Sequence, residues 1–274
     1  CSRSLGQLLR MTASTGQAGR PTIPPALVEG LRKWAPPVLV FIAVLLIWEI
    51  YYSDGGFFNP IPTPSAILAA LFEEWELLST SALATIFEAH GGLAIGTTAG
   101  LNVGFLTSRW AIARDILLPL AIGASTIPII AVAPILNNWF GVLNPLSKMM
   151  MAALLVFFPV VINVTRGLVE VGPAKLELMR SYAADETTVM RKLRVPHMLP
   201  FFFTALKVGT TLAFIGAIVG EFFGGTSNVL WRVVLQAISG GKFDVAWAAN
   251  IIGATAAILS YVAVTLSERA VNPW

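Results

Sequence analysis

Six long apolar stretches are the sequence feature that most limits how this chain can fold. They lie at about residues 35–52, 84–106, 116–136, 146–164, 204–223 and 245–266. A helix needs about 20 mostly apolar residues to cross the hydrocarbon core of a bilayer. The chain is 56% hydrophobic and only 12% charged, whereas a soluble domain carries about 25% charged residues. We therefore expect an all-α membrane protein with six transmembrane helices.

The positions of the lysines and arginines predict the orientation of these helices. All 18 basic residues except Lys148, Arg232 and Lys242 fall in the amino-terminal tail, in the loops after the second and fourth spans, at the start of the fifth span or at the carboxyl end. Cytoplasmic segments of membrane proteins are enriched in Lys and Arg. Both termini are therefore expected in the cytoplasm, and the acidic segment 54–83 outside.

The amino-terminal segment predicts a division of the chain into two parts. Its first 30 residues are rich in Gly, Ser, Thr and Pro, a composition that buries too little apolar surface to fold. We expect residues 1–33 to form a flexible cytoplasmic tail and residues 34–274 to form the membrane domain. Met11 resembles a natural start, which makes residues 1–10 a candidate upstream extension.

Small residues and prolines distinguish two of the expected spans. The second span carries a glycine at every fourth position: Gly92, Gly96, Gly100 and Gly104. Such a face favours close contact between helices. The third span is interrupted by four residues that weaken a helix: Gly123, Ser125, Pro128 and Pro134. We expect kinks there, which helix bundles tolerate when neighbours satisfy the freed carbonyls.

A charged loop at about residues 173–200 separates the fourth span from the fifth. Charged groups cost several kcal/mol each in hydrocarbon, so this loop must lie at the membrane surface. Asp185 is expected to cap a short helix that Pro196 ends. An apolar stripe along that helix favours a docking surface for a soluble partner, whereas a solvated connector is the alternative.

The spacing within this loop resembles the cytoplasmic loop of ATP-binding-cassette (ABC) importer permeases. The family pattern is Glu-Ala-Ala, three residues, Gly, nine residues, then Ile-x-Leu-Pro. Glu177 stands at the Glu position, Ala183 at the Gly position, and Leu193–Pro196 at the final motif. Ala tolerates positive φ poorly compared with Gly, so Ala183 is the main departure from the pattern.

The resemblance extends from about residue 85 to residue 274. The segments TIPIIAVAPILNNWFG (126–141), FFPVVIN (157–163) and VGEFFGG (219–225) are similar to the branch that imports nitrate, sulfonates, taurine and thiamine-precursor pyrimidines. The pair ELMRS and FFPVVIN is most similar to the pyrimidine-precursor and riboflavin-like members. The resemblance implies a type I importer-like fold in the cell inner membrane.

The resemblance also implies partners and site residues. An ATPase subunit would dock on the charged loop, a second permease copy would complete the channel, and an extracellular solute-binding protein would deliver a small anionic or heteroaromatic solute. Glu177 would pair with a basic residue of the ATPase. The expected docking residues are Glu177, Arg180, Ala183, Asp185, Glu186, Arg191 and Pro196.

Polar residues in the third and fifth spans are candidates for the transport pathway: Ser125, Thr126, Asn137, Asn138 and Glu221. Intramembrane polar groups are functional hypotheses by default. In the alternative interpretation, Ser125 and Thr126 satisfy carbonyls freed by Pro128, and Glu221 pairs with Arg232.

Several chemistries find no support in the sequence. Residues 240–243 (GGKF) lack the spacing of a P-loop, so ATP and Mg²⁺ are expected on the partner subunit. No catalytic arrangement stands out, and Cys1, His90 and His197 do not form a metal site. No basic, aromatic-interleaved patch suggests nucleic acid. A self-contained ion-coupled carrier remains the alternative function, and it would need carboxylates at mid-depth in the membrane.

Overall fold

The computed structural model describes residues 25–53, 61–226 and 228–272, with side chains from residue 35 onward. The described residues are helical and contain no β-strand. By their contacts they divide into two units, with the boundary between residues 51 and 52. The predicted tail falls mostly outside the described residues, and its boundary at residue 33 stays a prediction.

The first unit contains helix α2 (Pro25–Tyr52) except for its last residue. Its segment Ala35–Tyr52 is long and apolar enough to span a membrane, and none of it is buried. Large apolar side chains such as Leu39, Phe41 and Ile47 are about two-thirds exposed. A helix that is apolar on all sides suits a lipid environment.

Helix α7 (Pro145–Val169) is central to the second unit. It packs against both α4 (Trp75–Arg109) and α10 (Val195–Phe223). Its residues Val156, Val160 and Val164 are fully buried in the main core. Asn144 caps the start of α7 by accepting a hydrogen bond from the Leu146 N–H, and Pro145 occupies the first turn, where a missing N–H costs nothing.

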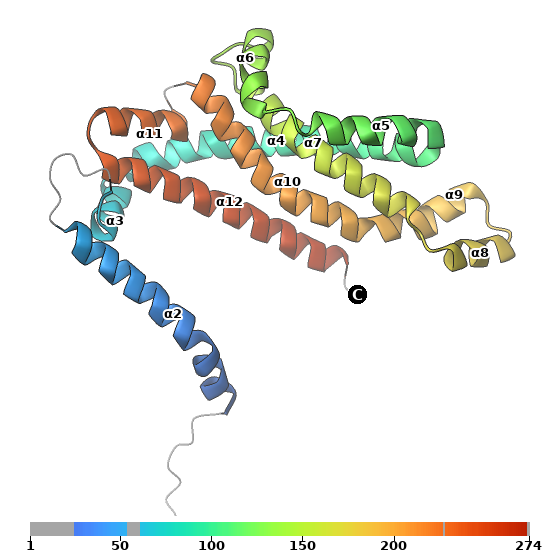
Figure 1. The fold of residues 1–274 in the computed structure, drawn as a ribbon, viewed down its shortest axis with the longest axis horizontal. Coiled ribbons are helices and arrows are strands. Elements are labelled where there is room, and N and C mark those ends of the chain that lie inside the picture. Colours follow the sequence, from blue (N-terminus) through green and yellow to red (C-terminus); the bar gives the residue numbers. More distant parts are fainter. Residues whose placement is uncertain (1–24, 54–60, 227, 273–274) are drawn as a thin grey trace, which may run out of the picture. The chain divides into compact units, whose positions relative to one another are not determined.

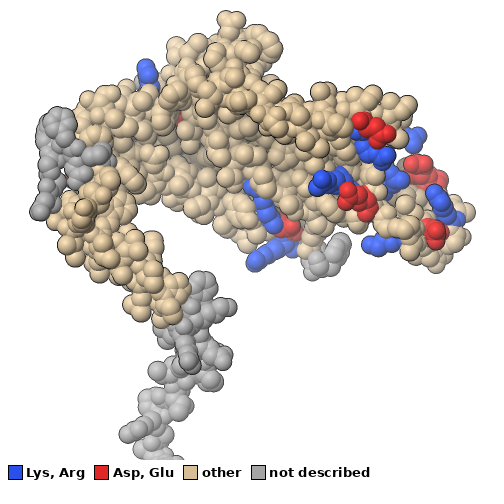
Figure 2. All heavy atoms as spheres, viewed as in Figure 1, with Lys and Arg blue, Asp and Glu red and all other residues tan. Residues whose placement is uncertain are grey.

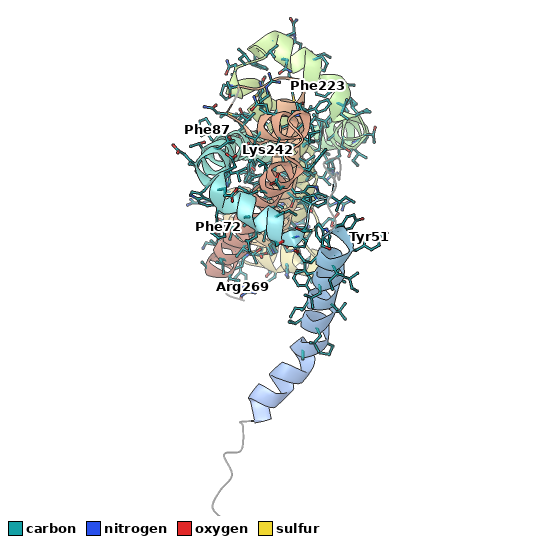
Figure 3. All side chains as sticks on the ribbon, turned by 90° about the vertical axis from the view of Figure 1, so that its left-hand side faces the viewer. Tyr51, Phe72, Phe87, Phe223, Lys242 and Arg269 are labelled. Atoms are coloured by element: carbon teal, nitrogen blue, oxygen red, sulfur yellow. The ribbon has the colours of Figure 1, made fainter. Side chains whose placement is uncertain are left out.

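The remaining helices of the second unit lie around these three (Figure 1). α12 (Phe243–Val271) packs against α10, α3 (Pro64–Glu73) and α11 (Leu230–Ser239). The short helices α3 and α11 lie at one end of the bundle, and α8 (Pro173–Ser181) and α9 (Glu186–Val189) lie at the other. Seen nearly along the axes of α10 and α12, Phe72 of α3 and Phe87 of α4 project away from the bundle (Figure 3).

The predicted glycine face of α4 is confirmed. Gly92, Gly96, Gly100 and Gly104 are all buried, and each lies directly against α7. A Cβ atom on Gly96 would lie 2.5 Å from the Ala153 carbonyl oxygen and 2.9 Å from the Val156 Cβ. The absence of side chains therefore allows the two backbones to approach.

The predicted third span is broken more sharply than a kink. It consists of α5 (Ala111–Ala124) and α6 (Ile129–Phe140), which are bent by 99° relative to each other. Pro128 precedes α6 with an extended backbone, so the α-helical hydrogen bonds of α5 cannot continue through it.

Composition and length support fewer spans than predicted. Within the described residues, four helices qualify, with the bent pair as a possible fifth: Ala35–Tyr52, Pro145–Val169, Glu186–Phe223 and Phe243–Val271. The glycine-rich α4 is not among them, although its 35 residues would extend about 52 Å. Six spans therefore stay a prediction.

We expect Gly96→Ala to lower the thermal midpoint of the detergent-purified protein by about 3–10 °C. The reason is that overpacking a tight contact costs about 1–3 kcal/mol. Gly123→Ala is the matched control, because nothing lies within 4 Å of the position where its Cβ would be. Equal midpoints for the two variants would show that α4 and α7 do not depend on this close approach.

Candidate functional site

The charged loop presents its predicted docking residues to the outside. All seven are exposed: Glu177, Arg180, Ala183, Asp185, Glu186, Arg191 and Pro196. None of the residues of α8 is buried, and Tyr182 is 76% exposed. Basic and acidic side chains gather at this end of the bundle (Figure 2). The loop therefore combines charge with exposed apolar surface.

Ala183 adopts the backbone conformation that the family pattern assigns to glycine. Its φ is 50°, and it is the only non-glycine residue with positive φ among those described. The Ala183 N–H donates to the Arg180 carbonyl at 2.9 Å, and the Ala184 N–H donates to the Met179 carbonyl at 3.1 Å. This pair of bonds is the Schellman motif, which ends a helix with a left-handed residue. The turn is thus kept without the glycine that would favour it.

The predicted cap of the short helix is confirmed. The Asp185 side chain accepts hydrogen bonds from the Thr188 N–H at 3.3 Å and from the Thr188 hydroxyl, and α9 begins at the next residue. The hydroxyl bond, which favours the carboxylate form, holds the pKa of Asp185 below its usual value. The side chain of Glu186 forms a 3.7 Å ion pair with Arg109 at the end of α4.

The prediction that Pro196 ends this helix is wrong. The chain continues from α9 through a π-helical segment, η1 (Met190–Arg194), into α10, so one helix runs from Glu186 to Phe223. Pro196 lies in the first turn of α10, where a proline is tolerated. The Val195 N–H just before it donates to the Met190 carbonyl, in the wider π pattern.

The start of α10 is anchored to α7 near the charged loop. His197 Nδ1 lies 2.8 Å from the Gly167 carbonyl oxygen, and Gly167 packs directly against Met198 and Phe201. Further along, Lys207 of α10 forms a 2.5 Å ion pair with Glu268 of α12. The helix that begins in the loop is therefore bonded to two other helices of the bundle.

Two of the predicted pathway residues of the third span, Ser125 and Thr126, lie at its break, whereas Asn137 and Asn138 lie in the last turn of α6. The Ser125 hydroxyl donates to the Ile122 carbonyl and the Thr126 hydroxyl donates to the Gly123 carbonyl, each at 2.7 Å. These bonds fit the interpretation that both hydroxyls satisfy carbonyls freed by the break. Both side chains are exposed in the single chain, as is Asn138, whereas Asn137 is buried with its Oδ1 atom unpartnered.

Glu221 lies elsewhere, in a buried polar cluster at the end of the bundle away from the charged loop. Its side chain is 2% exposed. Oε1 accepts a hydrogen bond from the Thr85 hydroxyl at 2.5 Å, and Oε2 accepts one from the backbone N–H of Trp231 at 2.9 Å. The expected ion pair with Arg232 is not formed in the described part of the chain, because Arg232 is exposed.

Two further charged side chains, Glu88 and Lys148, complete what we call the Glu221 cluster (Thr85, Glu88, Lys148 and Glu221). They are 4% and 1% exposed and interact electrostatically with Glu221. Lys148 donates to the carbonyls of Val142 and Asn144 in the loop before α7. The sequence analysis used Lys148 only for the orientation of the spans and did not predict that it lies beside Glu88 and Glu221. Their presence in apolar spans was the signal that pointed to burial.

The described residues contain no group of three or more His, Cys, Asp or Glu side chains that would hold a metal ion. The structure thus describes two candidate regions, the charged surface loop and the buried Glu221 cluster. The helix Glu186–Phe223 connects them.

We expect Ala183→Gly to stabilise the turn by about 0.4–1 kcal/mol, because glycine removes left-handed strain at some cost in unfolded-chain entropy. Hydrogen–deuterium exchange of the segment 179–188 should slow about two- to fivefold. Ala174→Gly, in the first turn of α8, is the control and should speed exchange instead. Faster exchange in Ala183→Gly would contradict the strain argument.

Comparison with known proteins agrees with this architecture. A family model described as "Binding-protein-dependent transport system inner membrane component" matches residues 92–274. A chain of the MetNI methionine ABC transporter, solved in an inward-facing conformation, is 19% identical with a TM-score of 0.62, over 73% of this chain and 98% of that chain. This likeness shows the fold.

Relatives of known name cover nearly the whole chain. A probable ABC transporter permease protein of Haemophilus influenzae is 31% identical over 83% of this chain and 93% of its own length. The formylaminopyrimidine transport permease ThiX of Halalkalibacterium halodurans is 31% identical over 87% and 95%. A putative aliphatic sulfonates permease, SsuC of Bacillus subtilis, is 26% identical over 92% and 95%.

These matches confirm the predicted resemblance. Together with the apolar helices, they identify a multi-pass protein of the cytoplasmic membrane. The chain belongs to the binding-protein-dependent transport system inner membrane components, as an ABC importer permease of the nitrate, sulfonate, taurine and thiamine-precursor branch.

Proposed function

We propose that this chain forms the membrane pathway of an ATP-driven importer and docks its ATPase subunit through the charged loop. The observation that carries the proposal is the exposed loop itself, which keeps the family spacing from Glu177 to Pro196 and the left-handed turn at Ala183. ATP and Mg²⁺ would bind on the ATPase subunit, and a solute-binding protein would deliver the solute.

The proposed topology has six spans and cytoplasmic termini. Helix α4 would be the span that raises the count from five to six, as the second span in chain order. It packs closely against the apolar α7. The charged loop, Arg109 at the end of α4 and Arg269 near the end of α12 would share the cytoplasmic side, in keeping with the enrichment of basic residues there. Two copies would enclose the pathway, and Ser125, Thr126, Asn137 and Asn138 remain our candidates to line it.

We further propose a heteroaromatic solute in preference to a small anion. The ThiX relative is named for a pyrimidine and is more similar to this chain than the SsuC relative, which is named for sulfonates. A cavity of about 360 Å³ between α4, α6 and α7 is lined only by apolar residues, Trp139 and Phe157 among them. Aromatic rings suit such a lining, whereas an anion needs positive or N–H partners.

The family membership argues against the alternative of a self-contained ion-coupled carrier. That alternative needs carboxylates free to exchange an ion. Glu221, the carboxylate singled out from the sequence, is not free in this sense, because it accepts two hydrogen bonds from protein groups and lies beside Lys148.

We expect Glu177→Arg to weaken binding of the cognate ATPase subunit about 30-fold or more. The physical reason is that breaking a buried interfacial charge pair costs about 2 kcal/mol or more. The measurement is co-purification from detergent, followed by titration of the ATPase onto the immobilised permease.

Glu73→Arg provides the matched control for this charge reversal. Glu73 is also exposed, but it lies at the end of α3, at the opposite end of the bundle. This control should bind the ATPase as the wild type does. If the wild type itself does not retain the ATPase, the docking proposal fails.

A further inference from the structure

We propose that Glu221 is a positioning residue for transport. It joins α4, α10 and α11 at the end of the bundle opposite the charged loop, and the loop acts on this junction through the continuous helix Glu186–Phe223. The inference rests on the proposed function, since it assumes that the ATPase moves the loop. It goes further by naming the contact that this movement controls.

Glu221 and Thr85 together cap the start of α11. The residue before α11, Val229, has no side-chain oxygen to cap the helix. The Leu230 N–H donates to the Thr85 hydroxyl at 3.2 Å, and the Trp231 N–H donates to Glu221 Oε2 at 2.9 Å. Side chains of α4 and α10 thus satisfy N–H groups that a helix start leaves open, and a carboxylate suits the helix dipole there.

Thr85 and Glu221 are also bonded to each other, and both are buried. The Thr85 hydroxyl, bonded to Glu221 Oε1 at 2.5 Å, links the two caps directly. Thr85 is 0% exposed and Glu221 is 2% exposed. A buried hydrogen bond to a charged group contributes about 1.5–3 kcal/mol, and leaving either partner unpaired costs more. Opening of the junction between α4, α10 and α11 would therefore have to break these hydrogen bonds.

Two further charged side chains, Lys148 and Glu88, lie close to this junction. Lys148 of α7 attracts Glu221, whereas Glu88 of α4 carries a second carboxyl group nearby, and Glu88 Oε2 has no hydrogen-bond partner. The Glu221 cluster thus contains two carboxyl groups and one ammonium group. When both carboxyl groups are ionised, Glu88 opposes Glu221 and makes the closed junction less stable than the Lys148–Glu221 attraction alone would make it. Such a balance suits a contact that must open in each cycle.

One continuous helix connects the charged loop to Glu221. Helix Glu186–Phe223 is unbroken, and about 50 Å separates its first turn from Glu221. Where it crosses α7, its small residues Gly216 and Gly220 lie against the Ala152 backbone and the Lys148 side chain. A helix of this kind transmits a rotation or a shift of its loop end to Glu221.

The experiment uses the complete transporter, reconstituted in liposomes with its ATPase and its solute-binding protein. Thr85→Val removes the hydroxyl and keeps the shape, which should favour the open junction about tenfold. We expect basal ATP hydrolysis to rise several-fold and its stimulation by the loaded binding protein to fall toward onefold. Thr85→Ser, which restores the hydroxyl, should recover the wild-type stimulation.

Thr80→Val is the matched control on the same helix. The Thr80 hydroxyl is exposed and bonds only to backbone carbonyls of its own helix, so this variant should keep wild-type stimulation. A merely structural role for Thr85 would lower the amount of assembled complex without changing the stimulation ratio of the complex that remains.

A distance measurement reports the junction directly. Spin labels on Leu83→Cys and Arg232→Cys, in a Cys1→Ser background, would mark exposed positions of α4 and α11. The wild type should show a longer distance when ATP is trapped, and Thr85→Val should show it without ATP. An unchanged wild-type distance during active transport would overturn the inference.

The two levels of proposal fail in different ways. If the wild-type permease does not bind the ATPase, the proposed function is wrong. If the wild type binds and is stimulated, but Thr85→Val and Glu221→Gln keep the same stimulation ratio, the function stands and the role of Glu221 is wrong.

Discussion

The close approach of α7 to its two neighbours is the contact on which the rest of the bundle depends. Lipid tails are as apolar as the side chains of a membrane helix, so burial alone gives membrane helices little reason to associate. Tight van der Waals packing must take its place, and glycines on α4 and α10 provide the room for it. The Glu221 cluster, the cavity between α4, α6 and α7 and the anchoring of the charged loop all depend on helices that this packing positions.

Local patterns in the sequence were enough to predict the features that arise within one helix. The fourfold spacing of glycines predicted the α4 face, and Asp185 predicted the start of α9. The same reasoning failed at Pro196, because a single residue does not reveal that a π-helical turn precedes it. It also predicted kinks at Gly123, Ser125 and Pro128 but not a 99° bend, whose size depends on what α5 and α6 pack against.

The polar cluster was the hardest feature to predict because its contacts join residues far apart in the chain. Glu221 was singled out, but its partners are a hydroxyl 136 residues away and a backbone N–H. A backbone donor has no sequence signature, and Arg232, one residue beyond Trp231, offered a more obvious partner. The loop before α11 places the N–H group, and not the guanidinium, within reach of the carboxylate.

The unbroken helix from the charged loop to Glu221 has a consequence for how such chains can vary. Each residue of an α-helix advances the direction of its side chains by 100°, so one inserted or deleted residue between Pro196 and Glu221 would turn the two ends out of phase. The π-helical segment at 190–194 is a place where an α-helix accommodates one extra residue. Among members of this family, insertions or deletions of single residues in this helix should therefore fall at that segment. The number of residues from Pro196 to Glu221 should stay constant.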